Sequence, residues 1–174
     1  MKKKLTVGLL LIGIPLLGAC SLSFWFGYTV PLILHDDTEV KTQAAQTDLL
    51  LPLAGLDFDQ GNWSAYLILD ANDFRSRYGR FSRNCLKLTD REIMKRMRDE
   101  WQLTRTGGDA ATVVSRIVFV QNGTVVFSSG ISLDERGNEG LQSRYFGWAE
   151  PRTNGVLMKY CRTFEPVYWP VIVL

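Results

Sequence analysis

The sequence has almost none of the histidine on which common catalytic sites depend. It contains one histidine, His35, in 174 residues, and this residue directly follows an apolar N-terminal run. A Ser-His-Asp triad, a Cys-His pair and a zinc site built on histidine pairs would each need histidine inside the folded domain. The composition therefore argues against these enzyme classes and predicts a non-catalytic protein.

Nucleotide-binding and acyl-transfer motifs are missing as well. The chain has no Gly-x-Gly-x-x-Gly, no phosphate loop ending in Gly-Lys-Ser/Thr, no Gly-x-Ser-x-Gly and no Ser-x-x-Lys. These motifs hold dinucleotides, phosphates or a serine nucleophile. We therefore expect no cofactor and no metal.

The N-terminus, by contrast, carries a strong targeting signal. Three lysines at positions 2–4 precede an almost uninterrupted apolar run over residues 5–34. A cationic segment followed by an apolar one is typical of a signal for export across the bacterial inner membrane. Within the run, the segment Leu17-Gly18-Ala19-Cys20 resembles the lipobox of bacterial lipoproteins.

This resemblance covers residues 1–21 and implies a location. It implies that residues 1–19 are a signal peptide and that Cys20 becomes the lipidated first residue, with acyl chains such as palmitate as the membrane anchor. Ser21 resembles the residue that directs such proteins to the outer membrane. The mature chain would then lie on the periplasmic side of the cell envelope.

An uncleaved membrane anchor over residues 5–28 is the alternative. The chain stays apolar after Cys20, and roughly 20 apolar residues span a bilayer. Phe24, Trp25 and Tyr28 would then lie at the membrane interface, and the protein would stay in the inner membrane. Both interpretations place the chain after about residue 35 outside the cytoplasm, with a tether or stalk over residues 20–48.

Residues 49–174 amount to one domain of ordinary globular composition. The precursor has 20 basic and 18 acidic residues. Cleavage before Cys20 removes three lysines, which leaves 17 basic against 18 acidic residues. Such a balanced charge provides no electrostatic attraction for nucleic acid.

Two cysteines remain in the exported part besides Cys20. An even number of cysteines in an oxidising compartment favours a disulfide, so we predict a bond between Cys85 and Cys161. The alternative is two separate buried thiols, since free cysteine packs as a small hydrophobe.

The order of predicted elements indicates an α+β domain with a mostly antiparallel β-sheet and one main amphipathic helix. A helix is expected after Thr89 or Asp90, because Ile93, Met94, Met97 and Trp101 share one helical face. Asn122-Gly123 suits a type I′ turn between strands at 112–121 and 124–133. Further strands are expected at 64–70, 142–148, 156–161 and 168–173, and a short helix or turn at 73–78.

Two segments carry candidate binding residues for a protein partner. The first mixes arginine with aromatic side chains, a combination suited to anionic surfaces; its residues are Arg75, Arg77, Tyr78, Arg80, Phe81 and Arg83. The second is the apolar C-terminal tail with Tyr168 and Trp169, which could add as a strand to a partner sheet. The alternatives are a connector whose aromatics dock on the core and an edge strand of the domain itself.

The resulting functional hypothesis is a membrane-tethered envelope protein that acts as a protein-interaction module, such as an accessory subunit of an envelope or secretion system. An immunity or exclusion lipoprotein, which neutralises an incoming toxin or element, is a second possibility. The third is a carboxylate-dependent enzyme on cell-wall or surface sugars. Its candidate acids are Asp57/Asp59, Asp70/Asp73 and Asp134/Glu135/Glu139, although acids in turns more often stabilise the turn.

Overall fold

Two residues with positive φ angles form the turn of the central hairpin. In the computed structural model, Asn122 (φ 53°) and Gly123 (φ 83°) both lie in the left-handed region, as a type I′ turn requires. They join β6 (Arg116–Gln121) to β7 (Thr124–Leu133), which pair antiparallel. The predicted hairpin is therefore confirmed.

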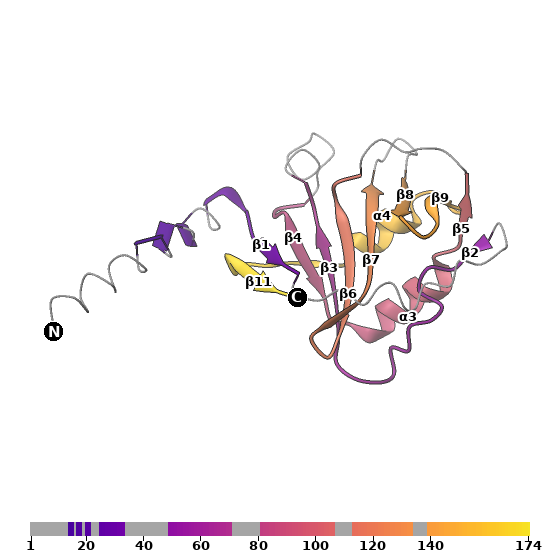
Figure 1. Cartoon of the computed structure of the whole chain (residues 1–174), viewed down its shortest axis with the longest axis horizontal. Helices are drawn as coiled ribbons and strands as arrows, with labels where there is room; N and C mark the ends of the chain where they lie inside the picture. Colours follow the sequence, from indigo (N-terminus) through magenta and orange to yellow (C-terminus); the bar gives the residue numbers. More distant parts are fainter. Residues whose placement is uncertain are drawn as a thin grey trace, which may run out of the picture.

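The hairpin lies in the middle of a nine-stranded antiparallel sheet (Figure 1). The strand order is β10-β4-β3-β6-β7-β8-β9-β5-β2 among the residues that the structure describes. The remaining strands are β2 (Leu49–Leu50), β3 (Trp63–Ile68), β4 (Cys85–Leu88), β5 (Leu103–Arg105), β8 (Glu139–Ser143), β9 (Gly147–Pro151) and β10 (Glu165–Pro166). The predicted α+β class with a mostly antiparallel sheet is confirmed.

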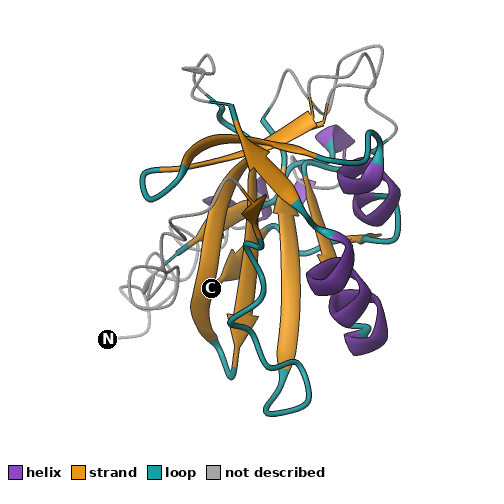
Figure 2. Ribbon diagram, turned by 90° about the vertical axis from the view of Figure 1, so that its right-hand side faces the viewer, coloured by secondary structure: helices purple, strands orange, loops and turns teal. Residues whose placement is uncertain are grey.

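Helix α3 (Arg91–Glu100) covers one side of this sheet, as predicted. The Asp90 carboxylate caps it by accepting the backbone N–H groups of Glu92 and Ile93 at 2.9 and 3.1 Å. Its apolar face is fully buried at Met94 and Met97 and joins the main core. Figure 2 shows that both helices of the domain lie on the same side of the sheet.

The second helix, α4 (Val156–Cys161), corrects the prediction of a strand at 156–161. Its N-cap residue, Gly155, makes no side-chain capping bond. Instead the buried Glu139 of β8 accepts the backbone N–H of Met158 at 3.0 Å. Five of the six residues are buried, so the sequence is apolar on nearly every side and lacks the polar face that distinguishes a helix from a buried strand.

The prediction of a single strand at 142–148 is also wrong. The structure places a turn at residues 144–146 between β8 and β9, and these two strands pair antiparallel. Gly147 has a φ of 71°, which permits the tight reversal. Residues 142–143 and 147–148 therefore belong to two adjacent strands.

A separate two-stranded parallel sheet joins the two ends of the described chain. It consists of β1 (Val30–Leu32) and β11 (Val171–Val173). Figure 1 shows the two strands side by side at one edge of the domain. The predicted C-terminal strand is thus limited to 171–173, and its neighbour β1 comes from the segment expected to be a tether.

This small sheet covers the second side of the large sheet. Ile172, Leu174 and Ile33 pack in a second apolar cluster with Val118 and Val120 of β6. Tyr66 and Ile68 of β3 border the same cluster. The large sheet therefore has a helix-covered side and a side partly covered by β1 and β11.

The described residues are 14–15, 17–18, 20–21, 25–33, 49–70, 81–106, 113–133 and 139–174. The cationic residues 2–4, the stalk at 35–48, the predicted element at 73–78 and the loop at 134–138 lie outside them. Within the described residues, no helix combines the length and the apolar character needed to cross a membrane.

Candidate binding surface

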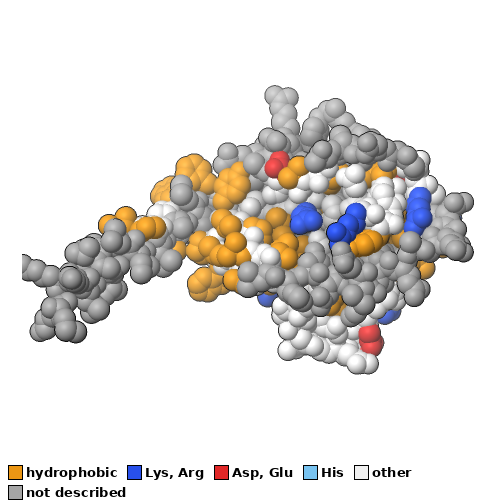
Figure 3. Space-filling model, in the orientation of Figure 1, with side chains coloured by type: hydrophobic (Ala, Val, Ile, Leu, Met, Phe, Trp, Pro, Cys, Tyr) orange, Lys and Arg blue, Asp and Glu red, His pale blue; other side chains and the backbone are white. Residues whose placement is uncertain are grey.

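The small sheet presents an apolar face to solvent. Val30 lies opposite Val171, and Leu32 lies opposite Val173; the exposed fractions of these four side chains run from 45 % to 62 %. Alternate residues along a strand point to opposite faces, and Ile172 accordingly packs on the second cluster. Hydrophobic side chains gather over β1 and β11 in Figure 3. We call the exposed side of the four paired residues the ribbon face.

The predicted binding residues Tyr168 and Trp169 precede β11 directly and are the most exposed aromatics of the C-terminal segment. Their side chains are 68 % and 74 % exposed. The backbone of Trp169 is nevertheless fixed by a hydrogen bond, because the buried Thr29 hydroxyl donates to the carbonyl of Trp169 at 2.9 Å. Two large rings on a fixed backbone make a pre-organised contact surface.

The predicted arginine and aromatic cluster is only partly described. Arg75, Arg77, Tyr78 and Arg80 lie outside the described residues. Arg83 is buried, and its guanidinium carbon lies 5.0 Å from the centroid of the Tyr168 ring, which is within cation–π range. Arg83 therefore contacts one of the candidate aromatics, and its role in binding a partner stays a prediction. Phe81 packs against the main core.

A groove of about 340 Å³ runs beside the two aromatics. Its walls are Lys87 and Thr89 on one side and residues 165–169 on the other. Lys87 and Glu165 face each other in the register of β4 and β10. The groove thus combines one basic and one acidic side chain with the exposed aromatics.

The N-terminal strand is attached to the domain by an asparagine that sequence reasoning missed. The Asn84 side chain accepts the backbone N–H of Thr29 at 2.7 Å and donates to the carbonyl of Thr29 at 3.0 Å. The Asn84 backbone N–H donates to the carbonyl of Gly27 at 3.1 Å. The sole signal for this contact in the sequence was Thr29, a polar residue inside the apolar run.

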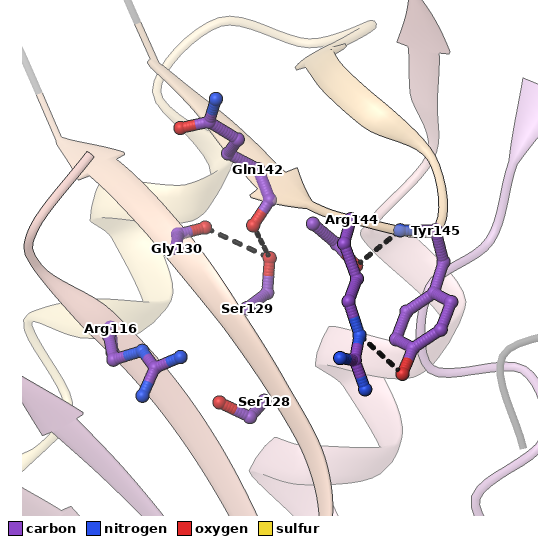
Figure 4. Close-up of a pocket in the computed structure, with 8 residues that line it drawn as sticks. Arg116, Ser128, Ser129, Gly130, Gln142, Arg144 and Tyr145 are labelled. Atoms are coloured by element: carbon purple, nitrogen blue, oxygen red, sulfur yellow. Dashed lines mark hydrogen bonds between the residues drawn. The ribbon is translucent and has the colours of Figure 1, made fainter. Parts of the chain in front are cut away.

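A second, polar pocket of about 290 Å³ lies on the β6–β7–β8 part of the sheet (Figure 4). The described residues that line it come from three strands and the β8–β9 turn: Arg116, Ser128, Ser129, Gly130, Gln142, Ser143, Arg144 and Tyr145. The side chains of Arg116 and Arg144 lie on either side of Ser128 (Figure 4). None of these residues is predicted by a sequence pattern, because their convergence depends on strand register.

The predicted disulfide is not formed. Cys85 and Cys161 are two free, fully buried thiols, and Cys20 is free and exposed. Burial raises the pKa of Cys85 to about 12. Burial, followed by the charge of Glu139, also raises the pKa of Cys161. Both groups are therefore neutral and inert near pH 7, as in the alternative of separate thiols.

Three of the candidate acids that the structure describes, Asp57, Asp59 and Glu139, serve the fold. Asp57 Oδ1 accepts the backbone N–H of Asp59 at 3.0 Å, which stabilises a turn. Asp59 lies 2.6 Å from Lys95, and this hydrogen bond lowers the pKa of Asp59. Glu139 caps α4, while Asp73, Asp134 and Glu135 lie outside the described residues. Nor does the described part of the chain contain a group of three or more His, Cys, Asp or Glu that could hold a metal ion.

Comparisons with known proteins indicate neither a family nor a function for this chain. No family model, no curated protein and no solved structure matches the chain. A function has to be inferred from the residues and surfaces of this molecule.

Proposed function

We propose that this chain is a membrane-tethered protein of the bacterial envelope whose domain binds a partner protein without catalysing a reaction. The ribbon face is the observation that favours this function most. Apolar side chains exposed in pairs on a regular sheet are unusual for a monomeric surface, and contiguous apolar surface marks interaction sites. The Cys20 segment and the apolar run before it support the tether.

The shape of the surface favours an extended segment of the partner. Among the described residues, β1 pairs with β11 alone and β11 pairs with β1 alone. Each strand therefore offers an outer edge whose backbone groups can pair with an added strand. The added strand would continue the sheet, so its own apolar side chains would lie beside those of the ribbon face, and Tyr168 and Trp169 would pack near its end.

The position of the surface fits a tethered protein. Strand β1 begins ten residues after Cys20, so the ribbon face lies close in sequence to the proposed lipid anchor. Anchoring both partners at one membrane raises their effective concentration, which allows a small contact surface to suffice. An accessory subunit and an immunity protein would both benefit from this arrangement.

Crosslinking in living cells tests the proposal. The full tagged chain and a Leu32→Thr/Val173→Thr variant are crosslinked, because threonine preserves strand propensity but reduces the apolar surface. Leu51→Thr is the matched control, since Leu51 is also exposed but follows β2 at the other end of the sheet. We expect one stoichiometric partner with the wild type and the control, and at least about a fivefold loss with the variant.

Two results would contradict the proposal. Equal crosslinking by all three proteins would exclude the ribbon face as the binding site. Recovery of the chain alone at saturating crosslinker would exclude a protein partner. Circular dichroism of each variant checks that the fold is retained.

A further inference from the structure

We propose that the pocket between Arg116 and Arg144 binds a phosphate group, held by the two guanidinium groups and the Ser128 hydroxyl. This site is separate from the ribbon face, and it does not depend on the function proposed above. Its ligand class follows from the charge, the hydrogen-bonding capacity and the space of the pocket.

The register of the sheet brings these groups together. Arg116 of β6 lies opposite Gly130 of β7, and Gly130 lies opposite Gln142 of β8. Ser128 is two residues before Gly130 and therefore points to the same face. Gly130 has no side chain, and a Cβ atom there would lie 3.3 Å from the Val113 side chain and 3.2 Å from the carbonyl oxygen of Gln142, so the two neighbouring strands pack closely at this point.

Ser128 is the most informative group in the pocket. It is only 9 % exposed, and among the described residues its hydroxyl has no hydrogen-bond partner. The neighbouring Ser129 hydroxyl, in contrast, lies 2.9 and 3.0 Å from the carbonyl oxygens of Gly130 and Gln142. A buried hydroxyl without a partner is destabilising, and a ligand oxygen at this position would satisfy it.

The charge of the described lining residues favours an anion. Two of its eight described lining residues are arginines and none is acidic. The Nε of Arg144 donates to the Tyr145 hydroxyl at 2.7 Å, which orients the guanidinium group beside the pocket (Figure 4). Planar guanidinium groups bind phosphate through paired, charge-assisted hydrogen bonds.

The size of the pocket indicates more than a bare ion. Its volume of about 290 Å³ is close to the lower end of the range for small-molecule sites, roughly 300–1,000 Å³. The pocket therefore has room for a phosphate with a small organic substituent. Free phosphate esters and the headgroup of an anionic phospholipid share this chemistry.

Calorimetric titration of the full chain in detergent separates the two sources. The soluble probes are inorganic phosphate and glycerol 3-phosphate, and the membrane probe is a nanodisc containing phosphatidic acid, compared with one of phosphatidylcholine alone. Binding of the soluble probes indicates a free phosphate ester. Binding of the phosphatidic acid nanodisc alone indicates a lipid headgroup.

Variants test the assignment of residues. We expect Arg116→Gln and Arg144→Gln to weaken binding about tenfold or more, as for the loss of a charge-assisted hydrogen bond. Ser128→Ala should weaken binding without lowering the melting temperature, because it removes an unsatisfied buried hydroxyl. Arg96→Gln is the control, since Arg96 is an exposed residue of α3 on the opposite side of the sheet.

The proposal is overturned if no probe binds, or if wild type, Arg116→Gln and Arg96→Gln bind equally. It is also overturned if Ser128→Ala lowers stability and leaves binding unchanged, because the hydroxyl would then have a structural role.

Discussion

Burial determines the chemistry of the two cysteines of the domain. Cys85 is the first residue of β4 and Cys161 is the last residue of α4, and neither side chain has measurable exposure. A thiol in an apolar environment stays protonated because the thiolate cannot be solvated there. Both thiols are free in the structure.

Thiol titration checks that Cys85 and Cys161 are free and buried. In a Cys20→Ser variant without reductant, we expect no reaction with a thiol reagent in the native state and two reactive thiols after unfolding in denaturant. The native thiols are unreactive because they are both buried and protonated. If no thiol reacts until a reductant is added to the unfolded chain, Cys85 and Cys161 form a disulfide in solution.

At the scale of elements, hydrogen bonds add to apolar packing in the attachment of β1. Asn84 satisfies both backbone groups of Thr29, and the Thr29 hydroxyl lies 3.2 Å from the carbonyl of Val167. Residues 27–29 are thus bonded both to the start of β4 and to the segment before β11. These contacts position the ribbon face relative to the large sheet.

Replacing Asn84 should loosen β1 and β11 selectively. Asn84→Ala leaves the N–H and the carbonyl of Thr29 buried without their partner, so we expect a loss of roughly 2–4 kcal/mol in the free energy of unfolding. Hydrogen exchange should accelerate at Val30 and Leu174, whose amides bond across the small sheet, while β6 and β7 keep their protection.

Asn154→Ala serves as the control, because Asn154 lies exposed in the turn before α4. We expect a change within about 0.5 kcal/mol there. Unchanged exchange at Val30 and Leu174 in the Asn84 variant would show that the Asn84 side chain is not needed to attach β1.

At the scale of the whole molecule, the titrating groups with raised pKa values predict sensitivity to alkali. Burial raises the pKa of Cys85 from 9.0 to about 12 and raises the pKa of Tyr160. The hydrogen bond from Lys95 to Asp59 and that from Lys159 to Glu100 raise the pKa of each lysine. In every case the native state binds its proton more tightly than the unfolded state does.

Stability should therefore fall as the pH rises above about 9. Between pH 9 and 12 the unfolded chain loses its thiol protons while native Cys85 keeps its own, so the free energy of unfolding decreases with pH. Melting temperatures measured from pH 7 to 11 check this, with Cys85→Ala as the comparison. The decline should be less steep in the variant, because Cys161 is then the one remaining buried thiol, and identical profiles would contradict the prediction.

Patterns within a short stretch of sequence were sufficient for the main elements. The cap at Asp90 and the spacing of Met94 and Met97 determine α3, and Asn122-Gly123 determines the central hairpin. Both depend on hydrogen bonds and steric limits among residues a few positions apart. The α+β class follows from such local signals taken in order. The proposed N-terminal targeting signal likewise depends on the sequence alone.

Only the tertiary structure decided where distant residues meet. Val156–Cys161 is helical because Glu139 caps it and the core surrounds it, and neither contact is visible in the local pattern. The pairing of β1 with β11, and the convergence of Arg116, Ser128 and Arg144, depend on strand order and register. Such contacts join residues such as Thr29 and Asn84, which are 55 positions apart, so no short-range periodicity encodes them.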